Sequence, residues 1–307
     1  MRAATIMLQL TVARRKMLWA YIFLAIPIVF FAVIRIYPAF FAFAMSLFDY
    51  NPLAVEQPYV GFENYQTLLT ELNKTRSVTR AAFINTTGYI VLGMPLQLLI
   101  ALAVALMLNE IRSFAMLFRL AFFLPFVTST IAISWVFRWL YQPQFGLFNV
   151  LLKAFELPQQ RFLNHPNQAL ASILAVVVWQ GLGFSIVIFL AGLKHIPRVY
   201  YEAARVDGAT RWQTFRSITL PLLNPSIVYL VVLQSISFLR MFAPVLAMTD
   251  QGDGGPLNST TTVVLRVYRE AFQRLNMGYA AALTVVLFGV ILLVTIFQLR
   301  VTTRRIN

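Results

Sequence analysis

Residues 202–221 read EAARVDGATRWQTFRSITLP, and this stretch decides the fold. Just before and within it, Val199, Ala203 and Val206 follow the i, i+4, i+7 spacing of one helix face. Gly208 comes directly after this face, and glycine is the residue that most readily takes the left-handed conformation in which helices end. The pattern therefore predicts a short amphipathic helix closed by a glycine turn.

A second short helix follows at once. Thr210 and Gln213 have the spacing of a capping box, in which each side chain bonds the backbone N–H of the other residue. Pro221 and Pro225 are expected to stop this helix before the next apolar run. From physics alone, the pair of helices suits two roles equally: lying on the inner leaflet of a membrane, or docking a partner protein.

The chain around this stretch has the composition of a membrane protein. It is 59% hydrophobic and 12% charged, whereas soluble domains carry about 25% charged residues. Six charge-free runs are long enough for a membrane-spanning helix, which needs about 20 apolar residues. The runs are 17–34, 81–108, 120–137, 166–193, 217–239 and 275–299. The helices built on them are expected over about 17–46, 82–108, 115–140, 168–193, 226–248 and 277–300, with a short interfacial helix at 148–155. The sequence therefore predicts an all-α polytopic membrane protein with six transmembrane helices.

Basic residues set the orientation of these helices. With the N-terminus inside, 14 of the 25 basic residues fall on the inner side and nine on the outer side, while Arg35 and Arg240 lie within spans. This bias predicts that both termini, residues 1–16 and 301–307, are cytoplasmic. It also explains the net charge of +14 without nucleic-acid binding. The first apolar run is too long for a signal peptide and is expected to stay as the first helix.

The residue inventory excludes several kinds of chemistry. The chain has no cysteine, so disulfides and thiolate metal sites are excluded. Its two histidines, His165 and His195, lie at helix ends without a second ligand at helical spacing, so no metal site is expected. No lysine closes a G-x-x-x-x-G-K-[ST] phosphate loop. We therefore expect no catalytic residue, no cofactor and no ATPase site in this chain.

The opening stretch also carries a family resemblance. It matches the pattern EAA-x3-G-x9-I-x-LP at every specified position, which are Glu202, Ala203, Ala204, Gly208, Ile218, Leu220 and Pro221. This pattern resembles the loop by which the permeases of ATP-driven (ABC-type) importers engage their ATPase subunits. The resemblance implies that residues 194–225 form a cytoplasmic docking loop, that Asp207 and Ala209 belong to it, and that Glu202 contacts the ATPase.

Most of the chain resembles the sugar-type permeases of binding-protein-dependent importers, such as those for maltose or glycerol 3-phosphate. Supporting stretches are Tyr37–Pro38, 60–65, Asn85–Thr86, 123–125, 207–209 and 278–280. The resemblance implies a type I ABC importer permease fold in the cell membrane, with a first helix and outer segment over 17–80 and a core over 81–300. It also implies a second homologous permease, two ABC ATPase subunits and an extracytoplasmic solute-binding protein as partners.

The sequence departs from this family in one outer loop. The family runs from a threonine directly into Gly-Gly-Gly-Pro, whereas here residues 250–253 separate Thr249 from Gly254–Gly255–Pro256. The insertion is expected to change the shape of this loop and its contact with a binding protein.

Two faces of the fifth span are candidates for the solute path. One face carries Gln234, Ser237, Phe238 and Met241, and the other carries Tyr229, Leu233, Ile236 and Arg240. The Gln234 face is favoured, because amide, hydroxyl and aromatic groups together suit sugar hydroxyls and ring faces. Arg240 could line the path or pair with an acid across a permease dimer. Arg35 is expected to extend to the outer interface.

The chief alternative to an ABC importer permease is an ion-coupled secondary carrier. Such carriers place carboxylates in their spans, and no Asp or Glu occurs within the six apolar runs. An intramembrane enzyme is a third class, but the sequence has no nucleophile elbow and no metal-ligand spacing.

Overall fold

The computed structural model describes residues 2–111 and 114–303. All regular elements in these ranges are helices, apart from one isolated bridge between Phe48 and Tyr59. Four helices are long and apolar enough to cross a membrane, and the number rises to six if each of two bent helix pairs is one span. The all-α, multi-span class expected from the sequence is confirmed. Arg112 and residues 304–307, part of the expected inner loop and tail, lie outside the described residues.

Four spans are continuous helices without a sharp bend. They are α1–η1–α2 (Arg2–Phe31, Ala32–Ile36, Tyr37–Met45), α4–η2–α5 (Val78–Gly88, Tyr89–Gly93, Met94–Glu110), α9 (Pro166–His195) and α16 (Met277–Thr303). One bent pair is α6 (Ala115–Val127) and α7 (Thr130–Leu140). The other joins α11–η4–α12 (Arg211–Thr214, Phe215–Thr219, Leu220–Leu222) to α13 (Asn224–Leu239).

Shorter helices lie in the connections between the spans. They are α3 (Glu63–Asn73), α8 (Leu147–Ala154), η3 (Phe162–Asn164), α10 (Arg198–Val206), α14 (Ala243–Met248), η5 (Asp250–Gly252), η6 (Pro256–Asn258), α15 (Val263–Tyr268) and η7 (Arg269–Gln273). The helix α8 confirms the short helix expected at 148–155.

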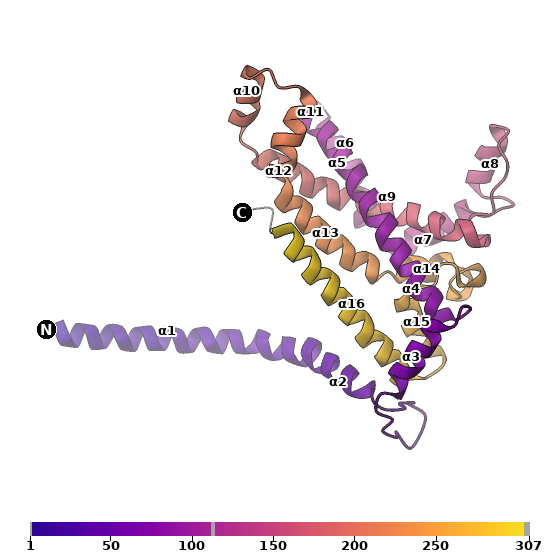
Figure 1. Cartoon of the computed structure of the whole chain (residues 1–307). Coiled ribbons are helices and arrows are strands. Elements are labelled where there is room, and N and C mark those ends of the chain that lie inside the picture. The colour runs from indigo at the N-terminus through magenta and orange to yellow at the C-terminus, as the bar shows by residue number, and fades with distance from the viewer. Residues whose placement is uncertain (1, 112–113, 304–307) are drawn as a thin grey trace.

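The helix α9 packs against α5, α6 and α13, while α16 runs beside α13 (Figure 1). Three buried polar side chains join α5, α9 and α13 inside this bundle, and we call them the polar joint. Gln97 Nε2 donates to Ser185 Oγ at 3.0 Å, and Gln234 Nε2 donates to the same oxygen at 3.3 Å. Their exposed fractions are 1%, 0% and 9% for Gln97, Ser185 and Gln234. Because each finds a partner, they hold the three helices together rather than destabilising the core.

Prolines inside three helical segments are accommodated by π-turns. The turns η1, η2 and η4 each begin six residues before a proline, which is Pro38, Pro95 or Pro221. Proline lacks an N–H and clashes with the carbonyl four residues before it, and a π-turn relieves both problems. The helix of residues 211–222 therefore continues through Pro221, contrary to the expected stop there. It bends by 64° at Leu223, where the next helix begins.

Two expected continuous helices are broken. The third, expected over 115–140, ends at Val127 and restarts at Thr130 with a bend of 95°. Gln180 of α9 makes this break possible, because its Nε2 donates to Thr128 O and to Thr130 Oγ1. The fifth, expected over 226–248, ends at Leu239 and restarts at Ala243.

A hydrogen bond from a distant segment holds the second break. Thr262 Oγ1 donates to Met241 O at 2.7 Å, and this bond satisfies a carbonyl that the break leaves free. A side chain 21 residues away therefore fixes the end of α13, and no local pattern in the fifth span predicts this end.

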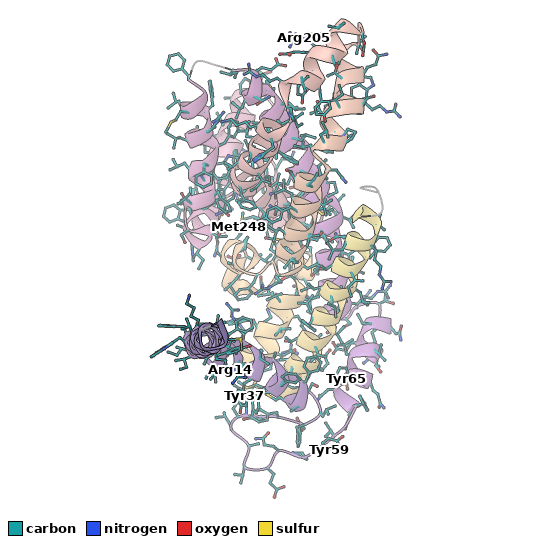
Figure 2. All side chains as sticks on the ribbon, turned by 90° about the vertical axis from the view of Figure 1, so that its left-hand side faces the viewer. Arg14, Tyr37, Tyr59, Tyr65, Arg205 and Met248 are labelled. Carbon is teal, nitrogen blue, oxygen red and sulfur yellow. The ribbon has the colours of Figure 1, made fainter. Side chains whose placement is uncertain are left out.

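The two ends of the body carry different elements. Figure 2 places Arg205 of α10 at one end and Tyr59 and Tyr65 at the opposite end. We call these the loop end and the far end. The helix α1 projects away from the body (Figure 1). The region of α2 packs on the body, where Phe43 meets the ring of Phe288 edge-on at 6.3 Å.

Candidate functional site

The expected docking loop has the predicted helix–turn–helix geometry. The first helix, α10, starts after Pro197, whose extended backbone precedes the helix. Gly208 adopts φ of +72°, its N–H donates to Arg205 O, and Ala209 N–H donates to Ala204 O at 2.9 Å. These two bonds form the Schellman end of a helix. A Cβ added at Gly208 would meet nothing within 4 Å, so within this chain the backbone conformation alone requires the glycine.

The second helix begins with the capping box expected from the sequence. Thr210 N–H donates to Gln213 Oε1 at 2.8 Å, and Gln213 N–H donates to Thr210 Oγ1 at 3.3 Å. Tyr201 and Thr219 join their hydroxyls at 3.1 Å and so brace α10 against η4. The two short helices are therefore held in one orientation relative to α13.

The loop presents an unpaired surface. Ala204 faces inward and is 7% exposed, whereas Glu202, Ala203 and Asp207 are exposed. Val206 and Trp212 beside them are 88% and 67% exposed. Among the ion pairs of the described residues, none includes Glu202 or Asp207. The remaining motif residues are exposed or partly exposed, and they are Ala209, Ile218, Leu220 and Pro221. A free acid beside exposed apolar side chains suits a protein partner.

The structure separates the candidate path residues of α13. Gln234, Phe238 and Met241 are 9%, 2% and 5% exposed and point into the bundle of this chain, where Gln234 belongs to the polar joint. Ser237 is exposed and so is Arg240, the residue that caps the C-terminal end of α13. A path shared between two subunits must be lined by side chains that are exposed in one subunit. Of the candidate path residues, Ser237 and Arg240 are thus the ones that this subunit leaves exposed.

Sequence reasoning missed a buried ion cluster at the far end. Arg266 and Glu270 are 4% and 3% exposed, and Arg266 Nη1 lies 2.7 Å from Glu270 Oε1. Arg266 Nη2 lies 3.5 Å from Glu71 Oε2, so the cluster ties α3 to α15 and η7. Arg266 and Glu270 are four residues apart, and this spacing could have pointed to their pair. The contact with Glu71 spans nearly 200 residues and leaves no local signal.

Electrostatics within this cluster affect Glu71. Partial burial acts to raise the pKa of the Glu71 carboxyl, but the hydrogen bond from Thr79 and the positive charge of Arg266 outweigh it. The pKa of Glu71 therefore lies below its ordinary value of 4.5. The cluster has the buried, paired geometry of a structural brace.

The insertion at 250–253 folds onto the body. Asp250 pairs with Arg138 of α7, and Arg269 Nε donates to Gly252 O at 3.0 Å. The following Gly254 has φ of +73°, and a Cβ there would lie 1.9 Å from Thr261 Oγ1. The inserted residues thus form a short helix, η5, held by two arginines rather than a loose extension.

The two histidines take part in helix-end hydrogen bonds. Asn167 N–H donates to His165 Nδ1 at 3.3 Å, and His195 Nδ1 lies 2.7 Å from Ala191 O. Each bond lies at an end of α9, the first at its N-cap and the second in its last turn.

Comparison with known proteins gives the family. Residues 76–307 match the family described as "Binding-protein-dependent transport system inner membrane component". The chain is 32% identical over 282 residues to the sulfoquinovosyl glycerol transport system permease protein SmoG of Agrobacterium fabrum, covering 92% of this chain and 87% of SmoG. It is also 32% identical over 287 residues to the multiple sugar-binding transport system permease protein MsmF of Streptococcus mutans, covering 93% of this chain and 96% of MsmF.

A solved structure has the same fold. One chain in the crystal structure of a bacterial alginate ABC transporter, in complex with an alginate pentasaccharide-bound periplasmic protein, has a TM-score of 0.80 to this chain. It is 24% identical, and the match covers 94% of this chain and 96% of that chain. The chain therefore belongs to the binding-protein-dependent transport system inner membrane components, and it is a multi-pass inner-membrane permease of an ABC importer whose ATPase activity lies in partner subunits.

Proposed function

We propose that this permease imports a sugar or sugar-like solute and that its 194–225 loop couples it to ATP hydrolysis by a docked ATPase. The observation that carries the docking role is the exposed, unpaired surface of α10. This surface combines Glu202 with small Ala203 and apolar Val206 on a helix that the Gly208 turn closes. The substrate class follows from relatives that are named for sulfoquinovosyl glycerol and for multiple sugars.

Residues 194–225 connect mechanically to the spans, so a movement of this loop would be transmitted to them. It connects α9 directly to α13, and the Tyr201–Thr219 hydrogen bond braces it against the helix that leads into α13. The polar joint then ties α13 to α5 and α9. An ATPase that moves α10 would therefore move these helices as a unit, as alternating access requires.

The partners of the chain are two ABC ATPase subunits, a second homologous permease and an extracytoplasmic solute-binding protein. Support for a second permease comes from the first span, Trp19–Met45, whose most apolar stretch has no buried residue. A span so exposed on one subunit suits packing against another. The loop end and both termini are cytoplasmic, and the basic-residue bias supports this orientation.

Docking is tested by co-purification of the tagged permease with its ATPase. Glu202→Lys is expected to reduce the retained ATPase at least tenfold, because a lysine reverses the charge that faces the partner. Glu56→Lys, an exposed site in the segment near Tyr59, is the matched control and should retain the ATPase fully. Scrambling residues 202–209 should abolish retention. Equal retention by the scrambled and native chains contradicts the docking role.

A further inference from the structure

The exposed face of α13 carries a charge at the end of a candidate span. Tyr229 is 49% exposed, and Ser237 and Arg240 are exposed on the same side of the helix. Arg240 is the C-cap of α13, the helix that forms the second half of a candidate span. Charged side chains on membrane-spanning helices face a water-filled path or a protein partner rather than lipid.

Arg240 has no acidic partner in the described residues. None of their ion pairs includes it. Across the candidate spans, the only acid is Glu110, the last residue of α5. A second permease of similar sequence would bring spans that are equally poor in acids. The charge that Arg240 meets is therefore best supplied by the solute.

Arg138 gives a contrast within the same chain. Both arginines lie near the C-terminal end of a helix, where a cation interacts favourably with free carbonyl groups. Arg138 also pairs with Asp250, and its guanidinium stands 5.0 Å from the ring centre of Trp135. Arg240 has neither kind of contact. Both arginines can therefore stabilise a helix end. Of the two, Arg138 also has an acidic and an aromatic partner, whereas the guanidinium of Arg240 has neither.

Resting on the proposed function, we propose that Arg240 is an anion-binding residue of the transport path and that the imported saccharide carries a carboxylate, sulfonate or phosphate group. The planar guanidinium suits bidentate bonds to such groups. Ser237, one turn earlier on the exposed face, adds a hydroxyl within reach of the same solute. A path that carries an unpaired arginine also disfavours cationic solutes.

Because the chain has no cysteine, a single introduced thiol can report the local electrostatic potential that Arg240 creates. Ser237→Cys gives the chain a single thiol, whose modification is timed in the assembled importer with the anionic sulfonatoethyl and the cationic trimethylammonioethyl methanethiosulfonates. Adding Arg240→Gln should lower the anion-to-cation rate ratio about fivefold, the effect of removing one charge about 8 Å away in water. Adding Arg240→Lys should keep the ratio. Val55→Cys, a fully exposed site, should show the same ratio with and without Arg240→Gln.

A second measurement tests the substrate class. Tri-galacturonate should slow modification of Ser237→Cys more than maltotriose at equal concentration, and Arg240→Gln should remove the difference. Equal effects of the two sugars, an unchanged reagent ratio, or a thiol that is inaccessible in the assembled importer would overturn the inference. Retention of the ATPase is measured in the same preparations. Failure of the inference with the ATPase retained therefore leaves the proposed function standing.

Discussion

The acidic residues of the loop end and of the far end lie in opposite environments. At the loop end, Glu202 and Asp207 are exposed and belong to none of the ion pairs of the described chain. At the far end, Glu270 is 3% exposed and pairs with Arg266, itself 4% exposed. A buried pair is complete within one chain and serves the fold. An exposed acid beside apolar side chains is left for another chain, so the contrast separates structural charges from functional ones.

The largest effect is expected from breaking the buried pair. Arg266→Met should lower the free energy of unfolding by about 3–5 kcal/mol, because it leaves the Glu270 carboxylate buried without its main partner. Arg274→Met is the matched control, since Arg274 contacts the same carboxylate through a side chain that is 61% exposed. This control should lower the free energy of unfolding by about 1 kcal/mol or less. Unfolding of the detergent-solubilised chain measures both, and equal losses would show that the cluster is not a brace.

Two glycines in the left-handed conformation sharpen the same comparison. Gly254→Ala should cost about 2–4 kcal/mol, because the new Cβ would both strain the backbone and collide with Thr261 Oγ1. Gly208→Ala at the loop end should cost only about 1–2 kcal/mol, since nothing in the chain lies near its Cβ. The same unfolding assay compares them. A larger loss of unfolding free energy for Gly208→Ala would mean that the loop packs against this chain and is not a free surface for a partner.

The exposed acid should affect binding and leave the fold unchanged. Glu202→Ala should change the free energy of unfolding by no more than about 0.5 kcal/mol, as for other surface positions. It should weaken the affinity of the permease for the ATPase by about tenfold or more. Titration of ATPase into permease in lipid nanodiscs measures the affinity. Loss of stability together with unchanged affinity would place Glu202 among the structural charges.

The smallest effect concerns the pH dependence of the far-end cluster. The pKa of Glu71 is lowered in the folded chain, so its ionised form contributes stability above the unfolded value near 4.5. This contribution should disappear as the pH falls through the lower folded value. Glu71→Gln removes the titrating group. The midpoint of thermal unfolding, measured from pH 6 to pH 3, should therefore fall more steeply below about pH 4.5 for the native chain than for Glu71→Gln. Parallel curves would contradict the cluster electrostatics.

Local patterns predicted the loop end well. Gly208, the capping box of Thr210 and Gln213, and the two short helices all depend on residues within four positions of one another, and the structure confirms each. The six apolar runs likewise predicted the spans, because length and hydropathy are properties of one segment. Family membership agrees with the resemblance carried by the EAA pattern and excludes the ion-coupled carrier.

Features that depend on distant segments were not predictable from one sequence. The break after Val127 needs Gln180, and the break after Leu239 needs Thr262. Periodicity grouped Ser237 with Gln234 on one face of α13, but it could not tell which residues α5 and α9 cover, and the structure leaves Ser237 exposed while it buries Gln234. Pro221 was read as a stop because the π-turn before it has no simple sequence signature.

One crosslinking experiment tests the docking role most directly. Ala203→Cys places the only thiol of the chain on the exposed face of α10. In the assembled importer, it should form a disulfide with a cysteine in a surface cleft of the ATPase, and Val55→Cys in the segment near Tyr59 should not. Crosslinking of Ala203→Cys that is no greater than that of Val55→Cys, in a preparation that hydrolyses ATP and transports solute, would contradict the assignment of residues 194–225 as the ATPase-docking loop.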